Sequence, residues 1–157
     1  MAVALAATAM LVAGCAGYSH PLASAEPASV GANAQVGQVL LRDVQVSTGV
    51  PAMNRDATVR LTLVNQAGQP DALTAVASDV AGRVEMFADA NCTQTARVAL
   101  PAGPSAQYTI GLSDLRIGLV RGGNVPITFT FANAGTITVP TPIDGTGTGT
   151  LPTGCAG

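Results

Sequence analysis

The stretch Val125–Phe131 reads VPITFTF, and the stretch Thr136–Val139 reads TITV, with Ala132-Asn133-Ala134-Gly135 between them. Apolar and polar side chains alternate in both stretches, which is typical of strands that bury one face. A four-residue connection between two such stretches suits a β-hairpin. This part of the chain therefore predicts two neighbouring antiparallel strands.

The same alternation recurs nearer the N-terminus. Ala57–Val64, ATVRLTLV, places Val59, Leu61 and Leu63 on one face. No sustained helical stripe follows residue 35, and Gly and Pro interrupt the chain often. The other expected strands are Val36–Val46, Ala72–Val76, Arg83–Phe87, Ala96–Leu100, Gln107–Ile110 and Leu115–Val120.

These strands predict an all-β domain over residues 36–143, an antiparallel Greek-key β-sandwich of the immunoglobulin-like kind with about seven to nine strands. Its core should be aliphatic, because the chain has no tryptophan. The expected core residues are Val59, Leu61, Leu63, Val84, Met86, Leu119, Ile127, Phe129, Phe131, Ile137 and Val139.

An apolar run precedes this domain and ends at a cysteine. The apolar run is Ala2–Val12, and Ala13, Gly14 and Cys15 follow it. Val12-Ala13-Gly14-Cys15 has the pattern of a bacterial lipobox, whose cysteine is acylated and becomes the new N-terminus. The run is shorter than the roughly 20 residues that span a bilayer, but it suits a signal peptide. We expect residues 1–14 to be a lipoprotein signal peptide and Cys15 to anchor the chain to the extracytoplasmic face of the cell membrane.

Two further segments have biased compositions. Residues 15–35 are rich in Ala, Ser, Pro and Gly and read as a flexible spacer between the lipid and the domain. Residues 144–157 form a Gly/Thr-rich tail of low complexity.

The charged side chains argue against several classes of function. The net charge is −2 and all seven cations are arginine, so no basic patch points to nucleic acid. Without lysine the chain has neither a nucleotide-binding phosphate loop nor a Schiff-base nucleophile. The single histidine, His20, lies in the spacer, which leaves the domain without an imidazole base. We therefore expect no enzyme, no nucleotide and no nucleic-acid partner.

Cys92 and Cys155 remain once Cys15 is acylated. A pair of cysteines outside the cytoplasm is usually a disulfide, and we expect one here. The alternative is a thiol pair that binds a soft ion such as Cu(I).

Several stretches also occur in the order and spacing of a known family. They are Asp71–Leu73, Asp79–Met86, Leu100–Gly103, Ile117–Leu119, Gly123–Phe131 and Ala134–Pro140, with Asn33–Gln38 and Arg42–Val44 ahead of them. In these stretches the chain resembles the periplasmic copper chaperones called PCu(A)C, and specifically their LpqE-type actinobacterial lipoprotein relatives. The resemblance implies a cupredoxin-like β-sandwich in the cell envelope.

The resemblance also implies where copper ligands would lie. The family binds Cu(I) through His and Met side chains, and its first His falls at Phe87, while its His-x-Met pair falls at Ser113 and Leu115. None of these three is a ligand for a soft ion, so the resemblance implies a degenerate metal site with no metal and no cofactor.

Two functions follow from these observations. The first is a lipid-anchored accessory module that contacts another envelope protein through the loops after Phe87 and around Ser113. The alternative is a copper-binding chaperone with rearranged ligands, drawn from Met53, Met86, Cys92, Cys155 and His20.

The Cys15→Ala substitution should release the protein from membranes into the soluble or secreted fraction, because no acyl chains can then be attached. Fractionation measures the release, and intact-mass analysis of the wild-type protein measures the modification. Membrane-derived wild-type protein with an unmodified Cys15 thiol would contradict the assignment.

If Cys92 and Cys155 are bonded, thiol counting on secreted, denatured and unreduced protein should find neither of them free. The bond closes a loop of about 64 residues, so reduction should lower the free energy of unfolding by up to about 4 kcal/mol. Cys92→Ser should have the same effect without reductant. Two reactive thiols in fresh oxidised protein would overturn the pairing.

Overall fold

The computed structural model describes residues 31–48, 56–88 and 93–144. This part of the chain folds as strands joined by turns, and it contains no helix long and apolar enough to cross a membrane. Its strands are β1 (Ala32–Val36), β2 (Val39–Thr48), β3 (Ala57–Asn65), β4 (Asp71–Ala77), β5 (Ala81–Phe87), β6 (Val98–Leu100), β7 (Ser105–Leu115), β8 (Asn124–Phe131) and β9 (Gly135–Asp144).

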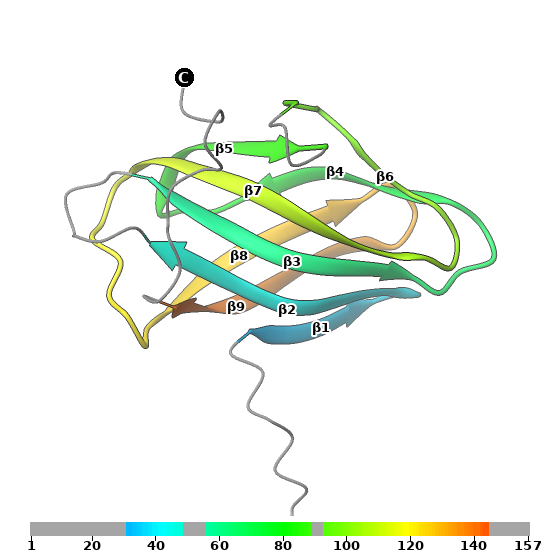
Figure 1. Ribbon diagram of the computed structural model, residues 1–157, viewed down its shortest axis with the longest axis horizontal. Helices are drawn as coiled ribbons and strands as arrows, with labels where there is room; N and C mark the ends of the chain where they lie inside the picture. Colours follow the sequence, from blue (N-terminus) through cyan, green and yellow to red (C-terminus); the bar gives the residue numbers. More distant parts are fainter. Residues whose placement is uncertain (1–30, 49–55, 89–92, 145–157) are drawn as a thin grey trace, which may run out of the picture.

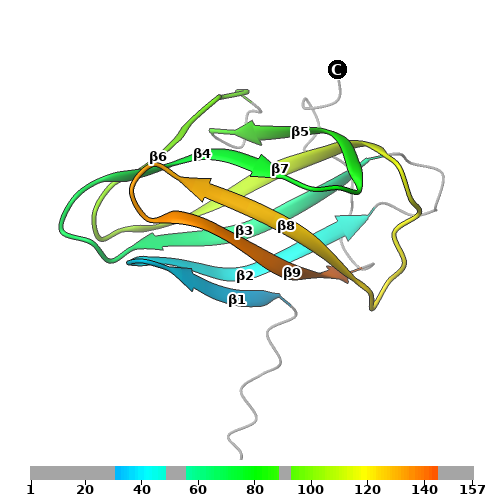
Figure 2. The ribbon, with the colours of Figure 1, turned by 180° about the vertical axis from the view of Figure 1, so that it is seen from behind.

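The strands form two layers that are joined along one side (Figures 1 and 2). The continuous strand order is β5-β7-β3-β2-β9-β8-β4-β6, and β1 pairs with β2. The pairs are antiparallel except for β2 and β9, which run parallel where Val46 and Ser47 face Ile143 and Asp144. The predicted all-β sandwich is confirmed, and the parallel pair is a feature that sequence alternation could not show.

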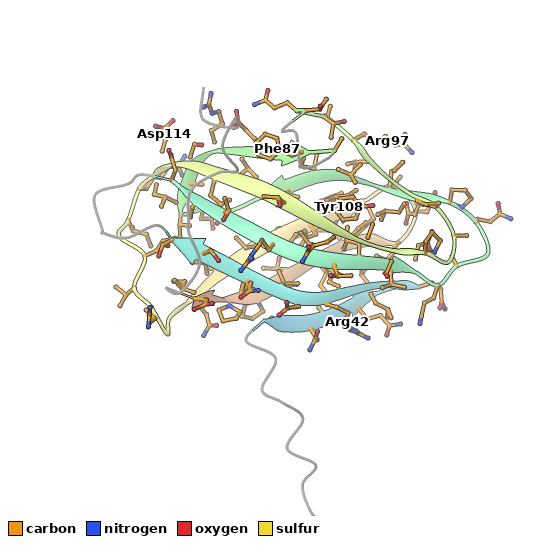
Figure 3. The ribbon with its side chains drawn as sticks, viewed as in Figure 1. Arg42, Phe87, Arg97, Tyr108 and Asp114 are labelled. Carbon is orange, nitrogen blue, oxygen red and sulfur yellow. The ribbon has the colours of Figure 1, made fainter. Side chains whose placement is uncertain are left out.

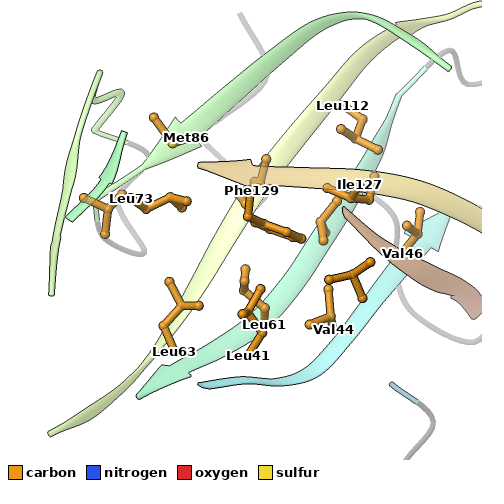
Figure 4. Packing of buried hydrophobic residues seen from close by; sticks show 14 of the residues in the cluster. Leu41, Val44, Val46, Leu61, Leu63, Leu73, Met86, Leu112, Ile127 and Phe129 are labelled. Carbon is orange, nitrogen blue, oxygen red and sulfur yellow. The ribbon is translucent and has the colours of Figure 1, made fainter. Parts of the chain in front are cut away.

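The core lies between the two layers and is built on β3. Val59, Leu61 and Leu63 are at most 1% exposed, as their alternation predicted. Ile127 and Phe129 fill the space from β8 in the opposite layer (Figure 4). Most of the expected core residues are buried, whereas three of them only pack partly buried against it: Val84, Leu119 and Ile137.

The first expected strand is in fact a hairpin. Val36 pairs with Val39 across a turn in which Gly37 has a φ of 52°, a left-handed conformation that glycine adopts without steric cost. β1 begins at Ala32, so the expected spacer at 15–35 extends four residues too far. Small alanines supply its inward face, and this weak apolar signal does not stand out from the Ala-rich sequence before it.

The expected strand Leu115–Val120 does not form. β7 instead continues to Leu115, and Asp114 has a φ of 54°, which departs from the extended conformation as the strand ends. Residues 116–123 then form a loop, in which Ile117 and Val120 are exposed. A run of apolar side chains was thus mistaken for a strand.

A buried carboxylate secures the β8–β9 hairpin to the start of β4. Asp71 is 8% exposed, and it accepts hydrogen bonds from the amides of Ala72 at 2.7 Å and of Asn133 and Ala134 at 2.9 Å. Burial by itself would raise the pKa of this carboxyl, but the backbone amides stabilise the ionised form and the net result is a lowered pKa. The ionised side chain therefore stabilises the fold.

Asp71→Ala should lower the free energy of unfolding near pH 7 by on the order of 3 kcal/mol, since hydrogen bonds to a charged group are lost and amides are left unpaired. Because the folded-state pKa is lowered, the stabilisation is full above the unfolded-state pKa of about 3.9 and is lost as the pH falls through the folded value. Denaturant titrations between pH 7 and pH 2 should therefore show the gap between wild type and variant narrowing in acid.

Asp79→Ala is the matched control, because Asp79 is an exposed carboxylate in a turn. It should change stability by no more than about 0.5 kcal/mol. A gap between wild type and Asp71→Ala that stays constant down to pH 2 would contradict the role of the ionised carboxylate.

Candidate functional site

The pairing of β5 with β7 decides which of the predicted ligand positions lie together. Phe87 is opposite Thr109, whereas Ser113 is opposite Arg83 and Leu115 is opposite Ala81. Phe87 and Arg83 are four residues apart on one strand, which corresponds to about 13 Å. Ligand atoms must approach a metal ion to roughly 2 Å, so Phe87, Ser113 and Leu115 cannot serve one ion.

This separation corrects the expected surface as well. The loops after Phe87 and around Ser113 were expected to form one contact surface, but Phe87 and Ser113 lie toward opposite ends of the β5–β7 pair. Figure 3 shows Phe87 and Asp114, the neighbour of Ser113, at separate places along these strands. Register between distant strands depends on tertiary packing, which is why the sequence could not reveal it.

Two residues that the sequence analysis missed surround Phe87. Thr109 lies opposite it on β7, and Gln94 forms an isolated bridge with it on the other side. Residues 93–95 lie beside the end of β5, because the amide of Ala88 donates to the Thr93 carbonyl and the amide of Thr95 donates to the Met86 carbonyl, both at 3.0 Å. The sequence carries no local signal for Thr109, because only the pairing of β5 with β7 places it opposite Phe87.

Phe87 itself is 3% exposed, although it is not part of the main core cluster. A phenyl ring has no lone pair to donate, and the hydroxyl of Thr109 and the amide of Gln94 are hard groups. Phe87, Thr109 and Gln94 therefore supply no soft donor for a Cu(I) ion.

A groove lies beside Phe87, between β4 and β5. It has a volume of about 580 Å³, and Thr74, Val76, Arg83, Glu85, Met86 and Gln94 contribute to its lining. Glu85 accepts a hydrogen bond from the Gln94 side chain at 2.6 Å and lies 3.3 Å from Arg83 Nε. We call this feature the β4–β5 groove.

Met86 is the one thioether among the described residues. It lines the β4–β5 groove, but it is 9% exposed and belongs to the core cluster. A single buried Met usually fills space in a core. Within residues 31–48, 56–88 and 93–144, no three His, Cys, Asp or Glu side chains are grouped so that they could hold a metal ion.

A second groove lies at the hairpin tips, with a volume of about 490 Å³. Its lining includes Gly37, Val39, Asn65, Asp71 and Ala134. The two buried polar side chains among these are already partnered, since Asp71 accepts amides and the Asn65 side-chain amide donates to the carbonyls of Gln69 and Leu100. Neither of these two buried side chains is therefore left free to bind a ligand.

Several predicted residues lie outside the described part of the chain. These are Cys15, His20, Met53, Cys92 and Cys155. Lipidation, the disulfide and the rearranged copper ligands therefore remain predictions.

The fold matches solved PCuAC domains and a copper-loaded protein. The apo PCuAC domain from PmoF1 has a TM-score of 0.68 at 22% identity, covering 73% of this chain and 99% of that one. The copper-bound PCuAC domain from PmoF2 has a TM-score of 0.65 at 19% identity, covering 73% and 98%. The solution structure of CuI-DR1885 from Deinococcus radiodurans has a TM-score of 0.55 at 20% identity, covering 73% and 81%.

At these identities the likeness establishes the fold, a PCuAC-type β-sandwich. No curated protein matches the chain. A family model does match it, over residues 39–143, which is more than half of the sequence and runs from the start of β2 to the last but one residue of β9. The chain therefore belongs to the LpqE-like family.

Proposed function

We propose that this protein is a lipid-anchored accessory module of the cell envelope, with a PCuAC-type sandwich that does not transfer copper by the His/Met mechanism. It acts through contact with another envelope protein. It is not an enzyme, and it uses neither a nucleotide nor a nucleic acid.

One observation carries the proposal: the register around Phe87. Thr109 and Gln94 are the residues that β7 and the segment after β5 bring beside it. A copper-chaperone site of the resembled kind needs His and Met at such a meeting point, and the described residues contain no His and one buried Met.

The anchor is supported by the sequence. Val12-Ala13-Gly14-Cys15 follows an apolar run, and the description of the LpqE-like family names a lipoprotein. Two acyl chains on one cysteine make a stable attachment, whereas a single chain does not.

The β4–β5 groove is the surface that we assign to the partner protein. It combines apolar walls with Arg83, Glu85 and Gln94, and such a mixture is typical of protein contact surfaces. β5 also lies at one end of the strand order. Residues 93–95 occupy its edge at Met86 and Phe87, so an extended partner segment would pair with the part of β5 before Met86.

Wild-type protein with Cys92 and Cys155 oxidised should fail to retain Cu(I) against a competing chelator, because neither Phe87 nor its neighbours donate a soft atom. Chelator competition at equilibrium measures this, with the Cys92→Ser/Cys155→Ser variant beside wild type. Stoichiometric Cu(I) retained by both proteins would reject the loss of ligands. In a second arm with Cys92 and Cys155 reduced, retention by wild type but not by the double serine variant would assign the ligands to the thiolates and favour the rearranged chaperone.

Rebuilding the site tests the register directly. Phe87→His/Thr109→His places two imidazoles on directly opposed residues, whose Cα atoms are about 4.5–5.5 Å apart in such a pair, and should create measurable copper binding. Phe87→His/Ser113→His is the matched control, with the same composition but about 13 Å along the strand between the two positions. Equal affinity in the two double variants would show that the register is wrong.

A further inference from the structure

The described residues carry two exposed large hydrophobic side chains, and both lie in the 116–123 loop. Ile117 is 55% exposed and Val120 is 73% exposed. Isolated apolar side chains on a surface are ordinary, but two of them within four residues of one loop make that loop a candidate contact site.

The exposure of these side chains is built into the loop, because the loop is held at both ends. The amide of Arg116 donates to the Val80 carbonyl at 2.8 Å, and its guanidinium donates to the Asp79 carbonyl at 3.3 Å. At the other end, the amides of Gly122 and Ile143 donate to the carbonyls of Ile143 and Gly123 at 3.1 and 2.9 Å. Ile117 and Val120 are therefore presented to solvent by a secured loop.

Arginines flank the apolar pair at Arg116 and Arg121, and both are exposed. Long basic side chains beside exposed apolar ones suit the boundary between headgroups and acyl chains, since the cation reaches phosphate while the apolar groups insert. Three carboxylates lie near these arginines, on the adjoining turn and strand ends: Asp79, Asp114 and Asp144. Their negative charges offset the arginines, so the electrostatic attraction of this end to an anionic membrane is weak. Apolar insertion must carry the contact.

The loop lies at the end of the sandwich where β1 begins. The first residue of β1, Ala32, pairs with Val44 of β2. Two residues further along β2, Val46 lies opposite Ile143 of β9, and Ile143 is hydrogen-bonded to the end of the loop. Figures 1 and 2 show the start of β1 and the loop, drawn in yellow, at the same end of the molecule from both sides.

That end is also the one to which an anchor on Cys15 is attached. The chain between Cys15 and Ala32 spans at most roughly 60 Å even when it is fully extended. An anchor on Cys15 would therefore keep the start of β1, and the 116–123 loop beside it, at a high effective concentration near the bilayer.

We propose that the 116–123 loop is a second membrane contact, which docks on the bilayer that holds the lipid of Cys15. Ile117 and Val120 insert at the headgroup–acyl boundary, and Arg116 and Arg121 contact headgroup phosphates. The contact orients the sandwich with its Asp71 end away from the membrane. This inference rests on the proposed lipid anchor for its biological setting.

Two glycines offer a matched pair of reporters, since the chain has no tryptophan. A Cβ at Gly118 or at Gly68 meets nothing within 4 Å, and neither residue has a positive φ. Gly118→Trp reports from the 116–123 loop and Gly68→Trp from the turn between β3 and β4, at the opposite end. The chain from residue 16 onward is attached through an N-terminal polyhistidine tag to vesicles of phosphatidylcholine and phosphatidylglycerol that contain nickel-chelating lipid and brominated acyl chains.

Gly118→Trp should shift its emission to shorter wavelength and be quenched by the bromine, while Gly68→Trp should change little. Adding Ile117→Ser and Val120→Ser to the Gly118→Trp chain should reduce the ratio of docked to undocked protein roughly tenfold or more. High salt should have a smaller effect than these two serines. Both serines replace exposed side chains, so folding is preserved.

Equal quenching of the two reporters, or quenching that survives the double serine change, would overturn the proposal. So would a concentration-dependent emission shift without vesicles, which would assign the loop to contact between proteins. The artificial tether keeps this test separate from the lipid anchor. Absence of acylation on Cys15 would remove the anchor and leave the loop measurement standing.

Discussion

The register of β7 between β3 and β5 is the constraint on which the rest of the molecule depends. Ile110 and Leu112 are at most 1% exposed, and they face Val59 and Ala57 on one side and Met86 and Val84 on the other. A slip of one residue would turn these side chains outward and bring their polar neighbours into the core. The burial of a few aliphatic groups therefore also decides that Thr109 lies beside Phe87.

The two ends of the sandwich are stabilised by different kinds of hydrogen bond. At one end, buried polar groups hold the loops: the Asn65 side chain is 1% exposed, and it bonds the carbonyls of Gln69 and Leu100 and the amide of Ala67. Asp71 holds the β8–β9 hairpin in the same way. At the other end, backbone bonds secure the 116–123 loop and leave apolar side chains in solvent. One end is therefore closed by buried polar groups, whereas the other presents two exposed apolar side chains among charged ones.

This member of the LpqE-like family shares its fold with PCuAC domains, but fold and chemistry are separable. A β-sandwich core requires aliphatic side chains at alternating positions, and this chain has them. A soft metal site requires a few specific donors at one point, and replacing those donors does not disturb the core. Phe87 illustrates the difference, since a buried ring is compatible with the sandwich and incompatible with a Cu(I) ligand.

Alternation in single stretches was enough to predict most of the strands. ATVRLTLV and VPITFTF became β3 and β8, with Val59, Leu61, Ile127 and Phe129 in the core, because a period of two specifies both strand and buried face. Order and spacing of short motifs were likewise enough to indicate the family, which the match over residues 39–143 confirmed.

Pairing between distant strands was decided only by the tertiary structure. A strand carries no local record of its partner, so the parallel contact of β2 with β9 and the separation of Phe87 from Ser113 could not be foreseen. Local composition also misled where side chains were small or solvent-exposed: the alanines of Ala32–Val36 pair as β1, and the apolar residues after Leu115 form a loop. The sequence determined which faces are apolar, and packing determined which of them meet.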